Sequence, residues 1–256
     1  MKYCLNSLFC MLVLTGCHHG TSPEKWINSI DHMVFIKVPA GMFEAEVPAD
    51  SHHTKVESLF FDQEFWMAEK EVTVEQFRHF VQMTGYITRA ELDSHRFTWN
   101  HPGFIQNADH PVVWLAFQDA LAYADWAGVS LPTQAEWLYA CRAGTTSRFF
   151  WGDSLNNQYV WHRANSGDGT RSTGSKLANP WGLYDMVGNA WEYTIVCDER
   201  WAAMGGSWTR CPQYMTRQGN IAEVLAETVV PKLTRCEPYE AYPYDDDRGF
   251  RCIRRF

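Results

Sequence analysis

Two acidic residues, Asp185 and Glu192, lie within one segment whose composition favours repeated turns. Gly188 and Asn189, which lie between them, are residue types that turns prefer, and the flanking aromatic residues can anchor such turns in a core. Carboxylates that bracket several backbone carbonyls suit calcium, because this hard cation takes about six to eight oxygen ligands. The segment therefore predicts a calcium site, with the alternative that both acids only cap local turns.

Other candidate ligands lie in two further loops. A zinc or iron site built from His95, His101 and His110 is a minor alternative to a structural role for these histidines. The acidic run Asp245–Asp247 is followed at once by Arg248. We expect this run to form a solvated loop, with a cation site as the lesser alternative.

Motifs along most of the chain resemble, in the same order, those of the formylglycine-generating enzyme family, also called the sulfatase-modifying-factor domain. They are Phe35-Ile-Lys-Val-Pro-Ala-Gly41, Glu71-Val-Thr73, Asn100-His-Pro-Gly-Phe-Ile-Gln106, His110-Pro-Val-Val113, Asp119-Ala-Leu-Ala-Tyr-Ala-Asp-Trp126, Leu131-Pro-Thr-Gln-Ala-Glu-Trp137, Trp151-Gly152, Asn179-Pro-Trp-Gly-Leu-Tyr-Asp-Met-Val-Gly-Asn-Ala-Trp-Glu192, Gly205-Gly-Ser-Trp208 and Gly249-Phe-Arg-Cys252. The resemblance implies a C-type-lectin-like α+β fold, rich in ordered loops and with few regular elements.

The residues that carry catalysis in this family are replaced here. In the enzymes of the family, two cysteines beyond the Gly-Gly-Ser-aromatic motif bind copper as thiolates for oxygen-dependent oxidation of a substrate cysteine. The matching positions here are Arg210 and Met215, with Cys211 one position away. A guanidinium is a permanent cation and a thioether is a weak neutral ligand, so we expect no copper site. Ser207 matches a residue that lines the catalytic cleft and is expected to form hydrogen bonds within a turn.

The resemblance also assigns calcium ligands. One site would use the side chains of Asp185 and Glu192 with the backbone carbonyls of Gly188 and Ala190. A second, weaker site would use Asn165 and Asp168 with the carbonyls of Ser166 and Thr170, in a loop that is much shorter here than in the family.

The N-terminus has the features of a processing segment. Lys2 precedes an apolar stretch from Leu5 to Leu14 that is too short to span a bilayer, and Leu14-Thr-Gly-Cys17 follows at once. This resembles a bacterial lipobox, in which Cys17 would be lipidated after cleavage; an ordinary secretory signal is the alternative. The expected division is a signal peptide at 1–16, a lipidated tether at 17–30 and the domain at 31–256.

Five cysteines remain after the first three are assigned to the processing segment: Cys141, Cys197, Cys211, Cys236 and Cys252. Five thiols in an oxidising compartment suggest two disulfides and one free cysteine. Two pairings are considered, Cys141 with Cys252 and Cys211 with Cys236. In vertebrate family members the positions of Cys141 and Cys252 each pair with a different residue, which is absent here, and any single cysteine can also be a buried, inert side chain.

Periodicity predicts the regular elements. Val34–Val38 and Ser58–Trp66 have strand patterns, and Thr73–Thr84, Gln118–Ala127 and Thr133–Arg142 have helical spacing. In the second helix, Leu121, Tyr123 and Trp126 are expected to face the core, and the third opens with a capping box formed by Thr133 and Glu136. After Gly144 the periodicity nearly disappears, which indicates a long region of turns.

The net charge of the chain argues against one class of binding partner. The net charge of −8 at pH 7 argues against a nucleic-acid partner, because such binding rests on clustered cations. We expect a lipid-anchored protein of the cell envelope, on the outer membrane or facing the periplasm if the source is diderm, that binds another envelope or extracellular protein without catalysis. The alternative is an oxidoreductase of the same family that oxidises a cysteine, thiol or siderophore-type substrate with copper or iron, using residues other than the cysteine pair.

Overall fold

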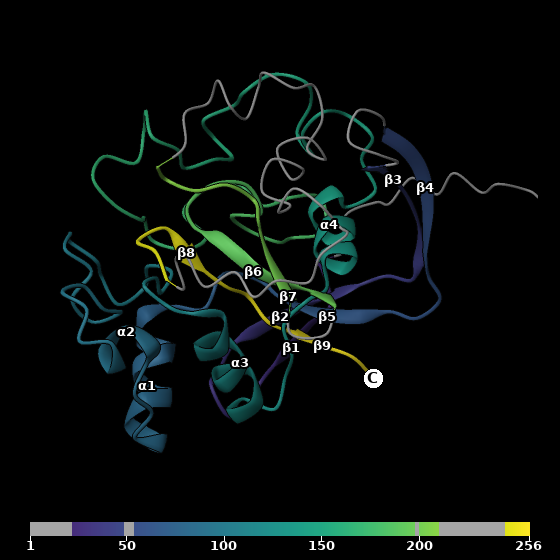
Figure 1. Ribbon diagram of the computed structural model, residues 1–256. Coiled ribbons are helices and arrows are strands. Elements are labelled where there is room, and N and C mark those ends of the chain that lie inside the picture. The colour runs from purple at the N-terminus through teal and green to yellow at the C-terminus, as the bar shows by residue number, and fades with distance from the viewer. Residues whose placement is uncertain (1–21, 49–53, 198–199, 210–243) are drawn as a thin grey trace, which may run out of the picture.

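The computed structural model describes residues 22–48, 54–197, 200–209 and 244–256, and the side chains of 45–57 and 197–200 lie outside what it describes. A four-stranded antiparallel sheet has the order β1-β2-β5-β9 (Figure 1). Its strands are β1 (Lys25–Ile27), β2 (Val34–Val38), β5 (Phe65–Ala68) and β9 (Ile253–Arg254). The two ends of the described chain therefore meet in one sheet.

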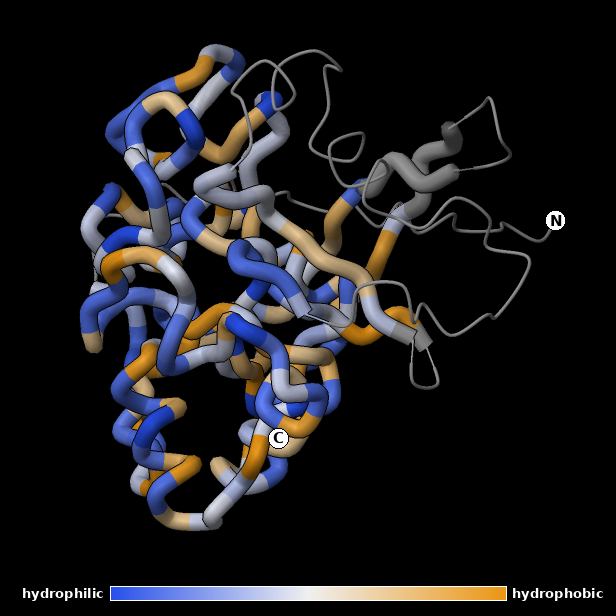
Figure 2. Tube along the Cα trace, turned by 60° about the vertical axis from the view of Figure 1, so that its left-hand side comes forward, coloured by the Kyte–Doolittle hydropathy of each residue, from blue (hydrophilic) through white to orange (hydrophobic). Residues whose placement is uncertain are grey.

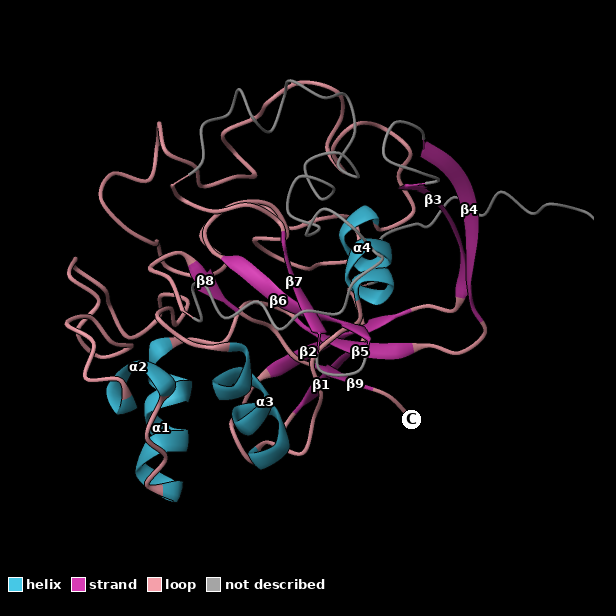
Figure 3. Ribbon diagram, in the orientation of Figure 1, coloured by secondary structure: helices cyan, strands magenta, loops and turns pink. Residues whose placement is uncertain are grey.

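A second sheet, with the order β7-β6-β8, carries the turn-rich motif. Its strands are β6 (Trp191–Cys197), β7 (Arg200–Met204) and β8 (Arg248–Gly249). β8 runs parallel to β6, with Glu192 opposite Gly249. This pairing brings the Gly-Phe-Arg-Cys motif beside Glu192. A separate hairpin of β3 (Gly41–Pro48) and β4 (Thr54–Phe61) stands at the edge of the molecule (Figure 3).

The helices are short, and two of them begin at threonine side-chain caps. α1 (Val74–Thr84) opens with a capping box between Thr73 and Gln76, and α4 (Gln134–Arg142) opens with the predicted box between Thr133 and Glu136. The other two are α2 (Arg89–Leu92) and α3 (Phe117–Trp126). Hydrophobic and hydrophilic residues alternate along the chain in Figure 2, as expected for elements that bury one face.

Two hydrophobic clusters fill the interior. The first packs α1 against α3, where Phe77 and Tyr123 stack at 6.0 Å between ring centroids. The second lies beneath α4 and contains Trp137, Met186 and Met204. Between residues 144 and 190 the described chain contains neither helix nor strand, as the loss of periodicity predicts. The mixture of elements confirms the α+β prediction.

Three local predictions were wrong. Ser58–Trp66 is not one strand, because polar residues 62–64 interrupt it and separate β4 from β5, which belong to different sheets. The expected tether at 17–30 contains β1, whose three residues are too few to show a period. Leu121 is exposed, since the buried face of α3 is formed instead by residues such as Phe117 and Ala120. No helix in the described part of the chain is long and apolar enough to cross a bilayer.

Candidate functional site

Glu192 lies in a fully hydrogen-bonded ion pair with Arg251. The guanidinium donates from Nε to Oε2 and from Nη2 to Oε1, both at 2.6 Å, and Trp137 Nε1 donates to Oε2 at 2.5 Å. Arg251 also donates to the carbonyls of Ala68 and Tyr184. Both partners are buried, with side-chain exposure of 1% for Glu192 and 0% for Arg251. A bidentate pair of this kind joins β6, α4 and the C-terminal segment.

Two more buried carboxylates lie close by and are less well satisfied. Asp185 has a left-handed backbone with φ of 53°, and its Oδ2 accepts from the Gly174 amide at 2.5 Å. Glu71 Oε1 accepts from Asn189 Nδ2 at 3.1 Å. The second oxygens, Asp185 Oδ1 and Glu71 Oε2, are buried without a hydrogen-bond partner among the described residues.

One guanidinium, that of Arg251, faces three buried carboxyl groups in this cluster, and this imbalance of charge affects their pKa values. Burial raises the pKa of Asp185 to about 6. Burial also raises the pKa of Glu71 well above its usual value, with further increases from Asp185 and Glu192. Removing carboxylates from water without enough partners costs free energy, so the cluster favours an added positive charge.

The predicted first calcium site stays a prediction, and the structure shows how its four residues are arranged. Asp185 has an open oxygen, and the turn that carries the Gly188 and Ala190 carbonyls is fixed, since a side chain at Gly188 would collide with the Trp161 carbonyl. Glu192 does not fit the predicted role in this arrangement, because both its oxygens accept from Arg251. Calcium bound here would depend first on Asp185. The ligand set from the sequence stays a prediction.

The second predicted site has its side chains committed elsewhere. Asn165 Oδ1 accepts from the His162 amide, and its Nδ2 donates to the Val160 carbonyl. Ser166 Oγ donates to the His162 carbonyl, and the hydroxyl of Thr170 lies 3.2 Å from His110 Nδ1. Asp168 is exposed. Of the two predicted side-chain ligands, Asn165 is therefore engaged by protein groups and Asp168 is exposed, and the second site stays a prediction.

Ser207 forms the hydrogen bonds within a turn that its position predicts. Its Oγ lies 2.6 Å from Asp247 Oδ2 and 2.9 Å from Thr209 Oγ1, which itself donates to Asp247 at 2.6 Å. The expectation of a solvated acidic loop was wrong for Asp247, which is buried because these hydroxyls satisfy it. Burial, followed by repulsion from Asp247 and Asp245, raises the pKa of Asp246 to about 6.

Asp245–Asp247 is also the one group of three potential metal ligands that converge among the described residues. His95, His101 and His110 therefore do not form a metal site. His110 is buried against Thr170, and burial lowers the pKa of its imidazole. This agrees with a structural role.

Cys141 and Cys252 are free thiols in the structure, so the considered bridge between them is absent. They belong to different hydrophobic clusters, which explains why they do not meet. Burial raises the pKa of Cys141 to about 12 and that of Cys252 well above its usual value. Cys211, Cys236, Arg210 and Met215 lie outside the described residues, as do Cys17 and the side chain of Cys197.

Sequence reasoning missed Glu71 and the pairing of Arg251. Both residues stand within the quoted motifs, Glu71-Val-Thr73 and Gly249-Phe-Arg-Cys252. The available signal was an acid or base inside an otherwise apolar motif, since such residues are almost never buried unless they are paired.

The profile of the sulfatase-modifying factor enzyme 1-like domain matches residues 19–256. The chain belongs to this family. It is 32% identical over 213 residues to formylglycine-generating enzyme from Bos taurus, with 62% of this chain and 56% of that protein covered. It is 33% identical over 124 residues to inactive C-alpha-formylglycine-generating enzyme 2 from the same organism, with 40% of each covered. The chain thus spans about half the length of the curated relatives it matches.

Solved structures agree on the fold. PvdO from Pseudomonas aeruginosa superposes with a TM-score of 0.69 at 18% identity, covering 93% of this chain and 100% of that one. At this identity the likeness concerns architecture alone. The sulfatase-modifying-factor domain and its family fold, expected from the motifs, are confirmed. The family includes both active and inactive relatives, so function depends on the residues at the site.

Proposed function

We propose that this sulfatase-modifying-factor domain is non-catalytic and acts as a lipid-anchored binding or accessory protein of the cell envelope. The observation that carries the proposal is the identity of Arg210 and Met215 at the family positions of the two copper-binding cysteines. Copper(I) is held by soft thiolates, whereas a guanidinium repels a cation and a single thioether binds weakly. A family member with these residues lacks the group that activates oxygen.

The buried thiols support this proposal. Cys141 and Cys252 are both inaccessible, lie in separate clusters, and have pKa values raised by burial. A thiol becomes a metal ligand or nucleophile as its thiolate, which burial in an apolar core disfavours. Neither cysteine is therefore suited to replace the missing pair. Cys211 supplies at most one thiolate.

A direct assay tests the absence of catalysis. Purified protein is incubated with a cysteine-containing sulfatase peptide, with and without copper, while loss of the substrate thiol and oxygen consumption are followed. We expect no turnover. Arg210→Cys with Met215→Cys should increase copper(I) affinity without necessarily restoring activity, and Arg163→Cys with Met83→Cys, at exposed positions, is the matched control.

Turnover by the wild type would overturn the proposal and make Cys211 the first residue to replace. Metal analysis of protein purified without added metal gives an independent readout. Stoichiometric copper or iron would favour the oxidoreductase alternative, in which the family chemistry is carried by other residues.

Anchoring is tested separately. The proposed lipidation of Cys17 rests on Leu14-Thr-Gly-Cys17 after an apolar stretch. We expect Cys17→Ala to release the protein from membranes, because an acyl chain provides the attachment. Cys10→Ala, within the apolar stretch, is the control and should leave fractionation unchanged. Membrane association of Cys17→Ala after a salt wash would refute the anchor.

A further inference from the structure

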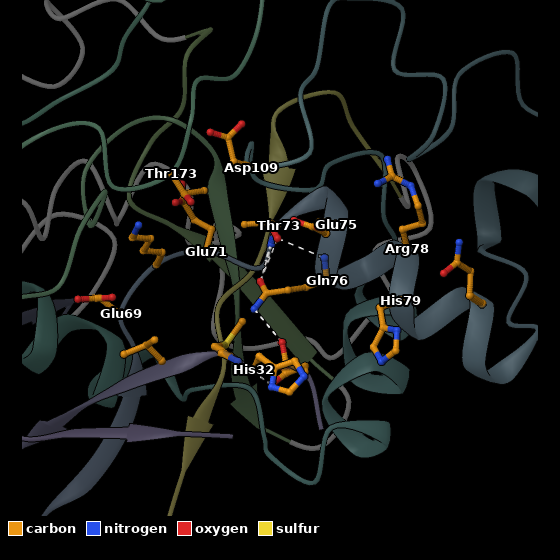
Figure 4. A pocket seen from close by; sticks show the side chains of 15 residues that line it. His32, Glu69, Glu71, Thr73, Glu75, Gln76, Arg78, His79, Asp109 and Thr173 are labelled. Carbon is orange, nitrogen blue, oxygen red and sulfur yellow. Dashed lines mark hydrogen bonds between the residues drawn. The ribbon is translucent and has the colours of Figure 1, made fainter. Parts of the chain in front are cut away.

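A groove of about 740 Å³ is lined by residues that do not include Ser207 or its hydrogen-bond partners Thr209 and Asp247. It is bounded by the turn between β1 and β2, the segment from Glu69 to Thr73 and the exposed face of α1, with Asp109 and Thr173 completing it (Figure 4). This volume is in the range of about 300–1,000 Å³ that small-molecule sites occupy.

The groove is not an anion site, although the N-terminus of α1 borders it. The first amides of the helix already donate to protein acceptors: Val74 to the His110 carbonyl, Glu75 to the Ala108 carbonyl, and Gln76 to Thr73 Oγ1. A helix N-terminus binds anions through free amide donors. In α1 the first three amides already donate to protein acceptors, so they are not available to an anion.

Carboxylates outnumber lysine and arginine among the lining residues. The acids are Asp31, Glu69, Glu71, Glu75 and Asp109, the bases are Lys70 and Arg78, and His32 and His79 also line the groove. Glu69 is already paired with Lys25 at 2.7 Å, and Lys70 lies over the Tyr184 ring. The carboxylates of Glu75 and Asp109 are on exposed residues.

Glu71 adds the feature that indicates a ligand. Its side chain is 1% exposed, and Oε2 has no hydrogen-bond partner among the described residues. Figure 4 shows it extending from the segment before α1 toward Thr173. A buried polar oxygen without a donor is costly, and a small turn of this carboxyl group toward a donor placed in the groove would relieve that cost.

We propose that this groove binds a primary ammonium or guanidinium group, which donates to Glu71 Oε2 while Asp109 and Glu75 supply negative charge at the rim. The site is independent of the non-catalytic assignment, because it shares no residue with the Ser207 turn. The rest of the groove accommodates the aliphatic part of the ligand, which is either a free amine or a lysine or arginine side chain of a protein.

Calorimetric titration and amide chemical-shift mapping of the full-length protein test this proposal. The probes are agmatine, as a free cation, and a capped glycine peptide with one central lysine; the same peptide with glutamate is the charge control. Saturating calcium is kept in all titrations so that metal binding near Asp185 does not vary. Binding of agmatine alone indicates a small-molecule site, and binding of the lysine peptide indicates a protein partner.

Glu71→Gln should weaken binding about tenfold or more, since a lost charged hydrogen bond has roughly that effect. Asp109→Asn, on an exposed residue where folding is not at risk, should weaken binding by a smaller factor. Asp62→Asn removes an exposed charge outside the groove and should leave it unchanged. Failure of both cationic probes to bind, equal binding of the glutamate peptide, or equal affinity for all three variants would overturn the proposal.

Discussion

The carboxylates of Glu192 and Asp247 are both buried beside glycine-containing turns, yet they are satisfied by different partners. Glu192 is paired with a buried guanidinium that reaches it across the fold, whereas Asp247 accepts from the hydroxyls of Ser207 and Thr209. The first network ties together strands from distant parts of the sequence. The second fixes the Gly-Gly-Ser turn immediately before the family catalytic positions. The charged network therefore stabilises the domain as a whole, and the hydroxyl network stabilises the local geometry of the Gly-Gly-Ser turn.

The largest effect is expected from breaking the Glu192 ion pair. Arg251→Met leaves three buried carboxylates without their guanidinium, and removal of one partner from a buried pair costs about 3–5 kcal/mol. The free energy of unfolding is measured by urea denaturation. Arg255→Met is the matched control, because Arg255 pairs with Glu136 at 2.7 Å but is 44% exposed. That variant should lose about 0–1 kcal/mol. Equal losses of unfolding free energy in the two variants would contradict a special stabilising role for the buried Arg251–Glu192 ion pair.

Calcium should have the next largest effect. Bound to the native state alone, it would add about 2.7 kcal/mol at a hundredfold excess over its dissociation constant. We expect calcium to raise the melting temperature of the wild type and chelation to lower it. Asp185→Asn should abolish the response, because Asp185 has the open oxygen. Asp168→Asn is the control at the second predicted loop. A melting temperature that does not respond to calcium in the wild type would leave the 185–192 segment as a turn without a bound metal.

A smaller and local effect is expected at Ser207. Ser207→Ala removes one of the two hydroxyl donors to Asp247 Oδ2, and the loss of a hydrogen bond to a buried charged group costs about 1.5–3 kcal/mol. Thermal denaturation measures the loss, and Ser175→Ala, at an exposed serine, serves as the control. Matching melting temperatures for the two variants would show that Thr209 alone satisfies Asp247.

The sequence predicts the parts of this fold that local rules determine. The helices that begin at Thr73 and Thr133 follow from caps and spacing, and the turn-rich region follows from the loss of periodicity. The strands are harder, because β1 and β9 are two or three residues long and are stabilised by neighbours distant in sequence. Tertiary context decides such elements, and composition cannot show it.

The same limit applies to the site. The resemblance identifies Asp185 and Glu192 as one acidic pair, but it does not show that Arg251, from the last strand region, takes both oxygens of Glu192. Composition alone predicts a solvated acidic run at 245–247, because the two hydroxyl partners of Asp247 lie about forty residues earlier. Partners of buried charges are set by pairing across the fold, as in β6 with β8.

The smallest effect is a pH dependence at Asp246, the residue that precedes Asp247 of the hydroxyl network. Burial raises the pKa of Asp246 from 3.8 to about 6, so between these values the unfolded chain has lost a proton that the folded protein retains. Stability contributed by this group is therefore present below about pH 4, is lost as the pH rises to about 6, and is constant above that. Asp246→Asn should remove this decline and be relatively more stable above pH 6, whereas Asp62→Asn, at an exposed position, should retain it. Urea denaturation midpoints measured across this pH range test the prediction. Parallel curves for the wild type and Asp246→Asn would show that the ionisation of Asp246 does not change the stability of the fold.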